Sequence, residues 1–112
     1  MRVRVTYKTW NDIQTEETYY SQNVNDVVAD QIVDSLVDAI NRLHVNQSGK
    51  RVERMPRSYW RVSVTPFHLY YRFSRDKSYV LVFLLRYQKR RPLSPSTLKR
   101  LASEGEHDSF EF

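Results

Sequence analysis

The alternation of apolar and polar positions predicts a strand, a helical region and then three more strands. Residues 3–7 alternate strictly and indicate an N-terminal strand. Over residues 23–44 the apolar positions return every three or four residues, the spacing of one face of a long helix. Residues 9–22 lie between these elements. They favour a short helix, although the run "EETYY" also suits a strand.

Three further strands are predicted in "SYWRVSV", "FHLYYRF" and "SYVLVFLLRY". Only Thr65-Pro66 and Arg75-Asp76-Lys77 separate them, so neighbouring strands should form antiparallel hairpins. The third strand is apolar on both faces, which predicts a central position in the sheet. One face of the first two strands should pack on the helical layer, and it carries Trp60, Val62, Val64, Phe67, Leu69, Tyr71 and Phe73.

A last helix is indicated by Ser94 followed by Pro95, because serine caps a helix and proline suits its first turn. The elements together predict an α+β fold. A small antiparallel sheet, made of the N-terminal strand and three consecutive strands, packs on one or two N-terminal helices, and a short C-terminal helix follows. We expect a single domain over residues 1–102 and an acidic tail over residues 103–112.

The charge is unevenly distributed along the chain. Residues 49–100 carry fourteen Lys and Arg against two Asp and Glu, a net charge of +12. Such a segment suits a polyanion or an acidic protein, although a solvated basic surface is the alternative. We expect nucleic-acid contacts from the cations on the outward face and at the end of the last strand: Arg57, Arg61, Arg72, Arg86, Lys89, Arg90 and Arg91.

The tail carries four acidic residues and no cation. One hypothesis is that the tail folds back over the cluster Lys89–Arg91 as an internal mimic of an acidic partner. The alternative is a frayed and solvated terminus, because exposed ion pairs contribute only about 0–1 kcal/mol each.

Several classes of site are excluded by what the sequence lacks. There is no cysteine, so neither disulfides nor thiolate metal sites can form. No zinc-ligand spacing, phosphate-binding glycine loop or paired carboxylates are present, and we expect no metal and no cofactor. The longest apolar run is far below the ~20 residues that span a bilayer, so we expect no membrane contact and a cytoplasmic protein.

The order of the elements resembles the RelE/ParE superfamily of bacterial toxins from type II toxin–antitoxin systems. The resemblance covers residues 1–93 and rests on order and spacing, since each motif is short. Four stretches carry it: "ADQIVDSLVDAINRL", "GKRVERMPRSYWRVSV", "PFHLYYRF" and "VFLLRYQKRRPL". It implies an α+β toxin held inactive by a cognate antitoxin.

The resemblance also implies candidate catalytic residues. Arg61 stands where RelE-like toxins carry a lysine, and His68 where they carry the arginine that opens the third strand. Lys89 and Arg91 fall where those toxins place catalytic cations. Tyr87 and the following glutamine replace the histidine that ends the last strand in many nucleases of this superfamily.

Cleavage through the ribose 2′-hydroxyl needs a base, cations for the phosphate and a donor for the leaving oxygen. His68, Arg61, Tyr87, Lys89 and Arg91 are the candidates for these roles. His68 would be the one group on the outward face with an unperturbed pKa near neutrality. A hydrogen-bonded structural histidine is the alternative interpretation.

Three functions remain open at this point. The favoured one is a toxin that cleaves messenger RNA on the ribosome, as RelE-like members are implied to do. The second is a toxin that poisons DNA gyrase without catalytic residues, as ParE-like members are implied to do. The third, from a different class, is a non-catalytic nucleic-acid-binding module that uses the same cations.

Overall fold

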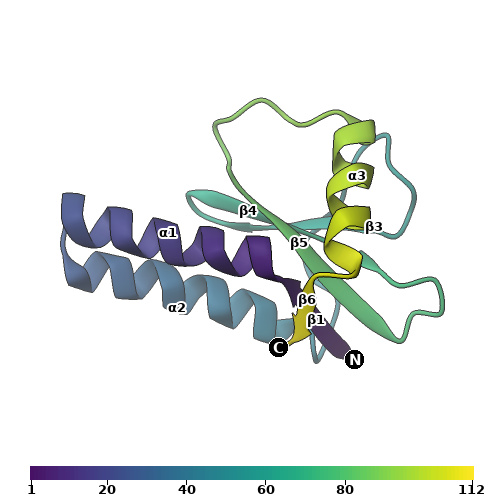
Figure 1. Cartoon of the computed structure of the whole chain (residues 1–112), viewed down its shortest axis with the longest axis horizontal. Helices are drawn as coiled ribbons and strands as arrows, with labels where there is room; N and C mark the ends of the chain where they lie inside the picture. The colour runs from purple at the N-terminus through teal and green to yellow at the C-terminus, as the bar shows by residue number, and fades with distance from the viewer.

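A six-stranded sheet in the order β2-β3-β4-β5-β1-β6 forms the centre of the protein, and the computed structural model describes all residues 1–112 (Figure 1). β3, β4 and β5 pair antiparallel in chain order, as their short links predict. β5 lies between β4 and β1, which confirms its predicted central position. The strands are β1 (Arg2–Thr6), β2 (Lys50–Arg51), β3 (Tyr59–Val64), β4 (Phe67–Phe73), β5 (Tyr79–Tyr87) and β6 (Ser109–Glu111).

The sheet is antiparallel except for one pair of strands. β1 lies parallel to β5, with Val3 opposite Val80 and Val5 opposite Val82. The two helices and the strands β2 to β4 lie between β1 and β5 in the chain, so these two parallel neighbours are not joined by a short hairpin. The alternation within β1 contains no information about this orientation, which explains why the sequence predicted a purely antiparallel sheet.

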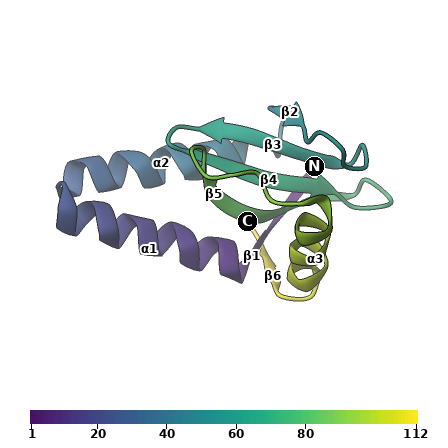
Figure 2. The same ribbon diagram turned by 90° about the horizontal axis from the view of Figure 1, so that it is seen from above.

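The N-terminal helices form an antiparallel hairpin whose tip extends past the sheet, while α3 lies towards the other end of the molecule (Figures 1 and 2). They are α1 (Tyr7–Asn23) and α2 (Asp26–Arg42). Residues 9–22 are therefore helical, in a longer helix than the sequence indicated. The side chain of Thr6 caps α1 at Thr9 N, and Asn25 caps α2 at Val28 N. No helix of the chain is both long and apolar enough to cross a bilayer.

The main core lies between this hairpin and one face of the sheet. Leu36 and Ile40 of α2 are fully buried there with Ile13 of α1. Leu69 and Tyr71 of β4 face them, as the alternation of that strand predicts. The rest of the predicted face also belongs to this core, with Phe67 fully buried and the others half-buried: Trp60, Val62, Val64 and Phe73.

A second core lies on the opposite face of the sheet, under α3 (Pro95–Glu106). Leu98 and Ala102 of α3 are buried there. Ser94 accepts a hydrogen bond from Thr97 N and Pro95 follows, which confirms the predicted start of this helix. β5 supplies its other apolar face here, and this is why that strand is apolar throughout.

β5 contains a bulge that changes which side chains face each core. Tyr70 lies opposite Leu84, but Tyr71 lies opposite Val82, so Phe83 is an extra residue without a partner on β4. Phe83 and Leu84 consequently both pack in the second core. Beyond the bulge every residue of β5 is on the face opposite to the one that simple alternation predicts.

Residues 103–112 do not form a tail over the cluster Lys89–Arg91, and that hypothesis is wrong. The first of them complete α3, and β6 then pairs antiparallel with β1. Glu111 forms ion pairs with Arg2 and Arg4. Phe110 and Phe112 stack edge-on with Trp10 of α1, at 6.1 Å and 5.9 Å between ring centroids. Strand pairing and aromatic packing therefore hold the terminus at the edge of the sheet next to β1.

Candidate functional site

Tyr87, a candidate proton donor, lies on the helical face of β5. Its ring packs on Phe67 with centroids 4.6 Å apart, and its hydroxyl donates a hydrogen bond to Glu16 of α1. Burial, followed by the hydrogen bond to Glu16, raises the pKa of Tyr87 well above its usual value. The bulge at Phe83 causes this orientation, since without it Tyr87 would point outward.

His68 lies on the outward face of β4, directly opposite Ser63 of β3 and Arg86 of β5. Its Nδ1 is 3.2 Å from the hydroxyl of Ser63. Burial lowers the pKa of His68, and the charge of Arg61 lowers it further. Both effects favour the neutral form of the imidazole. The structure brings Arg61, His68 and Arg86 to one face but keeps Tyr87 on the other.

Lys89, Arg90 and Arg91 lie in the exposed segment after β5. Hydrogen bonds to β4, β5 and the turn between β3 and β4 hold this segment in place. Gln88 N donates to Pro66 O at 2.9 Å, and the guanidinium of Arg86 donates to Arg91 O at 2.8 Å. None of the three cations forms an ion pair, so all three charges face solvent and are available to a polyanion.

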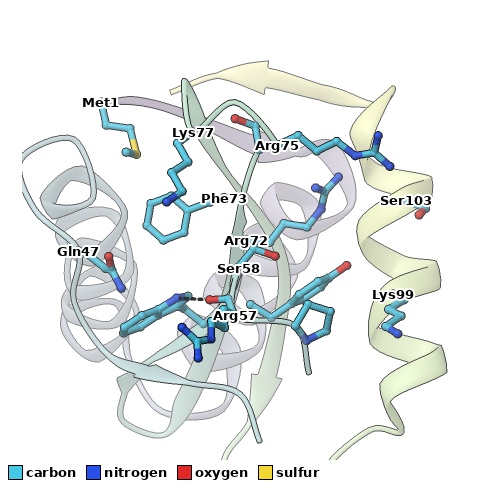
Figure 3. Close-up of a pocket in the computed structure, with 14 residues that line it drawn as sticks. Met1, Gln47, Arg57, Ser58, Arg72, Phe73, Arg75, Lys77, Lys99 and Ser103 are labelled. Atoms are coloured by element: carbon cyan, nitrogen blue, oxygen red, sulfur yellow. Dashed lines mark hydrogen bonds between the residues drawn. The ribbon is translucent and has the colours of Figure 1, made fainter. Parts of the chain in front are cut away.

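Arg57 and Arg72 lie at the other end of the sheet. In the pairing of β4 with β5, Phe67 opposite Tyr87 marks one end and Phe73 opposite Val80 marks the other. Arg72 is next to Phe73, and Arg57 precedes β3 at the same end. Both line a pocket of about 940 Å³ (Figure 3). Of the seven cations expected to contact nucleic acid, Arg57 and Arg72 thus lie at one end of β4, Arg61 lies opposite its middle residue Tyr70, and the others lie at or beyond its other end: Arg86, Lys89, Arg90 and Arg91.

Other residues of this pocket were not identified from the sequence. Arg75 and Lys77 come from the turn between β4 and β5, and Lys99 comes from α3. Glu106 of α3 does not line this pocket, but it forms an ion pair with Arg72 and accepts a hydrogen bond from Tyr79. The cations near this turn stand close together in the sequence and could have indicated an anion site. Lys99 and Glu106 reach them only because α3 packs against this end of the sheet.

The outward face can bind anions, and it carries one imidazole, that of His68, whose pKa is lowered by burial and by Arg61. Arg61 and Arg86 flank His68, and the cluster Lys89–Arg91 follows at the end of β5. Gln88 stands beside Tyr87 at the end of the last strand, and its side-chain amide donates a hydrogen bond to Phe67 O at 3.1 Å. No group of three or more His, Cys, Asp or Glu side chains is arranged to hold a metal ion.

Comparisons with known proteins agree with this architecture. The chain is similar in structure to the chromosomal ParDE toxin–antitoxin system from P. aeruginosa, with a TM-score of 0.65 and 18% identity. The match covers 78% of this chain and 95% of that one. A comparison with curated proteins gives no match.

A family model identifies the chain more directly. The model described as the ParE toxin of the type II toxin–antitoxin system parDE matches residues 3–92, which include β1 to β5 and both N-terminal helices. Its match ends before α3 and β6. The chain belongs to the family of ParE toxins of type II toxin–antitoxin systems.

Proposed function

We propose that this toxin stops growth by binding its target, DNA gyrase, rather than by cutting RNA. Membership of the ParE family supports this target, because ParE-like toxins are implied to poison gyrase without catalytic residues of their own. The observation that carries the proposal is the orientation of Tyr87. Its hydroxyl donates to Glu16 on the helical face, while His68 lies on the outward face. A proton donor and a proton acceptor are therefore not side by side.

We further propose that a cognate antitoxin neutralises the toxin. The solved relative from P. aeruginosa is a toxin–antitoxin system. The segment 49–100 has a net charge of +12, which favours an acidic partner. Coexpression of a small acidic protein encoded beside this gene should restore growth. Growth arrest that no neighbouring reading frame relieves would contradict this part of the proposal.

RNA cleavage is the second candidate, and a specific observation favours it. Arg61, His68 and Arg86 share one face, where a neutral imidazole could accept a proton beside two cations. The two candidates differ in whether His68 is essential. RNA cleavage requires it as a base, whereas binding to gyrase does not.

Mapping of RNA 5′ ends after expression of the toxin separates the two candidates. We expect growth arrest without new ends inside messenger RNA, and we expect His68→Gln to arrest growth equally well. New ends that are lost with His68→Gln would overturn the gyrase proposal and assign the toxin to the ribonucleases. Ser63→Ala is the control, because it removes the neighbour of His68 and retains the imidazole.

A further inference from the structure

A pocket between the end of β4 and α3 gathers positive charge from segments that are far apart in the chain (Figure 3). Of its 14 lining residues, five are Lys or Arg and none is Asp or Glu. Four of these cations are exposed and form no ion pair. We call them the pocket cations: Arg57, Arg75, Lys77 and Lys99.

The fifth cation, Arg72, forms an ion pair within the chain, whereas the pocket cations have no counter-charge. Glu106 neutralises Arg72 from the side of α3 and does not line this pocket. Cations that line the same pocket repel one another, because like charges raise each other's electrostatic energy. No Asp or Glu lines the pocket to relieve this repulsion. A bound anion would relieve it.

The turn that presents two pocket cations is held by its own hydrogen bonds. Asp76 Oδ1 accepts from Ser74 Oγ at 2.8 Å, from Ser78 N at 3.0 Å and from Ser78 Oγ at 2.7 Å. These bonds, chiefly those from Ser78, lower the pKa of Asp76 to about 2. The carboxylate thus forms its hydrogen bonds inside the turn, and these bonds hold the backbone that carries Arg75 and Lys77.

The remaining lining indicates what kind of anion fits. Trp60 and Tyr59 supply aromatic surface, and Trp60 Nε1 donates to Arg57 O at 3.0 Å, which holds the backbone at Arg57. Hydroxyl groups of Ser58 and Ser103 add donors. Cations beside an aromatic ring suit a phosphate ester attached to a flat base. A volume of about 940 Å³ is within the range of small-molecule sites.

We propose that this pocket binds a nucleotide, whose phosphates contact the pocket cations and whose base stacks on Tyr59, the lining aromatic residue on the same face of the sheet as α3. The nucleotide is either free or the phosphorylated end of a nucleic-acid strand, because both present the same chemistry. Lys99 and Ser103 belong to α3, outside the matched residues 3–92, so the site is completed by a segment beyond the family's common part. It is also separate from the cluster Lys89–Arg91 at the other end of the sheet.

Calorimetric titration of the purified full chain tests this proposal with four probes: ATP, tripolyphosphate, adenosine and a short single strand carrying a 5′-phosphate. The pocket variant is Arg75→Gln, Lys77→Asn and Lys99→Gln together. Asn is chosen because Lys77 has a φ of 58°, a conformation that Asn tolerates. The matched control is Lys89→Gln, Arg90→Gln and Arg91→Gln, which removes the same charge at the other end. Thermal melting verifies that both variants fold.

We expect ATP or the phosphorylated strand to bind, and the pocket variant to weaken that binding at least about tenfold. The control should retain most of the affinity. Tighter binding of ATP identifies a free nucleotide, and tighter binding of the strand identifies a strand end; both support the site. The proposal is overturned if neither binds, if the two triple variants lose affinity equally, or if tripolyphosphate binds as tightly as ATP.

Discussion

Glu106 of α3 forms an ion pair with Arg72 of β4, and both side chains are mostly buried, with 26% and 19% of their surface exposed. Tyr79 donates a second hydrogen bond to the same carboxylate. This pair connects the last helix to the sheet. It also gives Arg72, whose Nε is buried without a hydrogen-bond partner, its counter-charge within the chain.

Replacing Glu106 by Gln should therefore destabilise the fold. The substitution leaves Arg72 largely buried without a counter-charge, which we expect to lower the free energy of unfolding by about 1–3 kcal/mol. Urea unfolding measures this change. Glu104→Gln is the control, because Glu104 pairs with Arg100 on the exposed surface and its loss should have little effect. Equal stability of the two variants would contradict a structural role for the buried pair.

Gly105 is required where α3 crosses the start of α1. A Cβ at this position would lie 2.4 Å from Cγ2 of Thr6, a buried residue that caps α1. Gly105→Ala should therefore lower the free energy of unfolding by about 1–3 kcal/mol, although alanine is the better helix former.

The double variant Gly105→Ala with Thr6→Ser tests the cause of this loss. Serine keeps the capping oxygen and removes the clashing methyl group, so the double variant should recover most of the stability in thermal melting. Thr6→Ser alone provides the reference. If the double variant is no more stable than Gly105→Ala alone, the methyl contact is not the reason for the glycine.

Much of the fold follows from local patterns. The spacing of Leu36 and Ile40 identified α2, the alternation of Leu69 and Tyr71 identified the buried face of β4, and Ser94 identified the start of α3. Each of these signals involves residues within a few positions of one another. Such signals are readable from sequence because the physics that produces them is local.

The features that the sequence did not predict depend on distant contacts. Glu111 pairs with Arg2 and Arg4, more than 100 positions away, so the sequence suggested a tail instead of an edge strand. The bulge at Phe83 is hidden because "VFLLR" reads equally well with or without an extra residue. That single residue moved Tyr87 from the outward face to the helical one and separated it from the candidate site.

His68 should have a pKa below its usual value of 6.5, because burial and Arg61 both disfavour the imidazolium. The unfolded chain then takes up the proton first as the pH falls. Stability should decrease as the pH falls below about 6.5 and level off below the pKa of the folded protein. NMR titration of the imidazole measures this pKa directly.

Two variants test whether His68 causes the change of stability with pH and whether Arg61 lowers the pKa of His68. His68→Gln should flatten the change of stability with pH in this window, and Arg61→Gln should raise the pKa of His68 towards 6.5. A pKa at or above 6.5 in the unmodified chain would show that the imidazole is not shielded as the structure indicates.

The cluster Lys89–Arg91 should contribute electrostatically to association with DNA-bound gyrase. Replacing all three cations by Ala should weaken association and reduce its dependence on salt by up to about three counterions. Affinity measured across a range of salt concentrations gives this slope. Lys50, Arg51 and Arg54 are also exposed and unpaired, so their triple Ala variant is the matched control. Equal slopes for both variants would mean that only net charge matters.

The central claim is that this toxin acts by binding gyrase and performs no RNA cleavage. The most direct measurement is the supercoiling of relaxed plasmid by purified gyrase, with increasing amounts of the full chain and of its His68→Gln variant. We expect both proteins to inhibit supercoiling at similar concentrations, and the cognate antitoxin to abolish the inhibition. Undiminished supercoiling at a large excess of toxin, together with cleavage of messenger RNA in a translating extract, would contradict the claim.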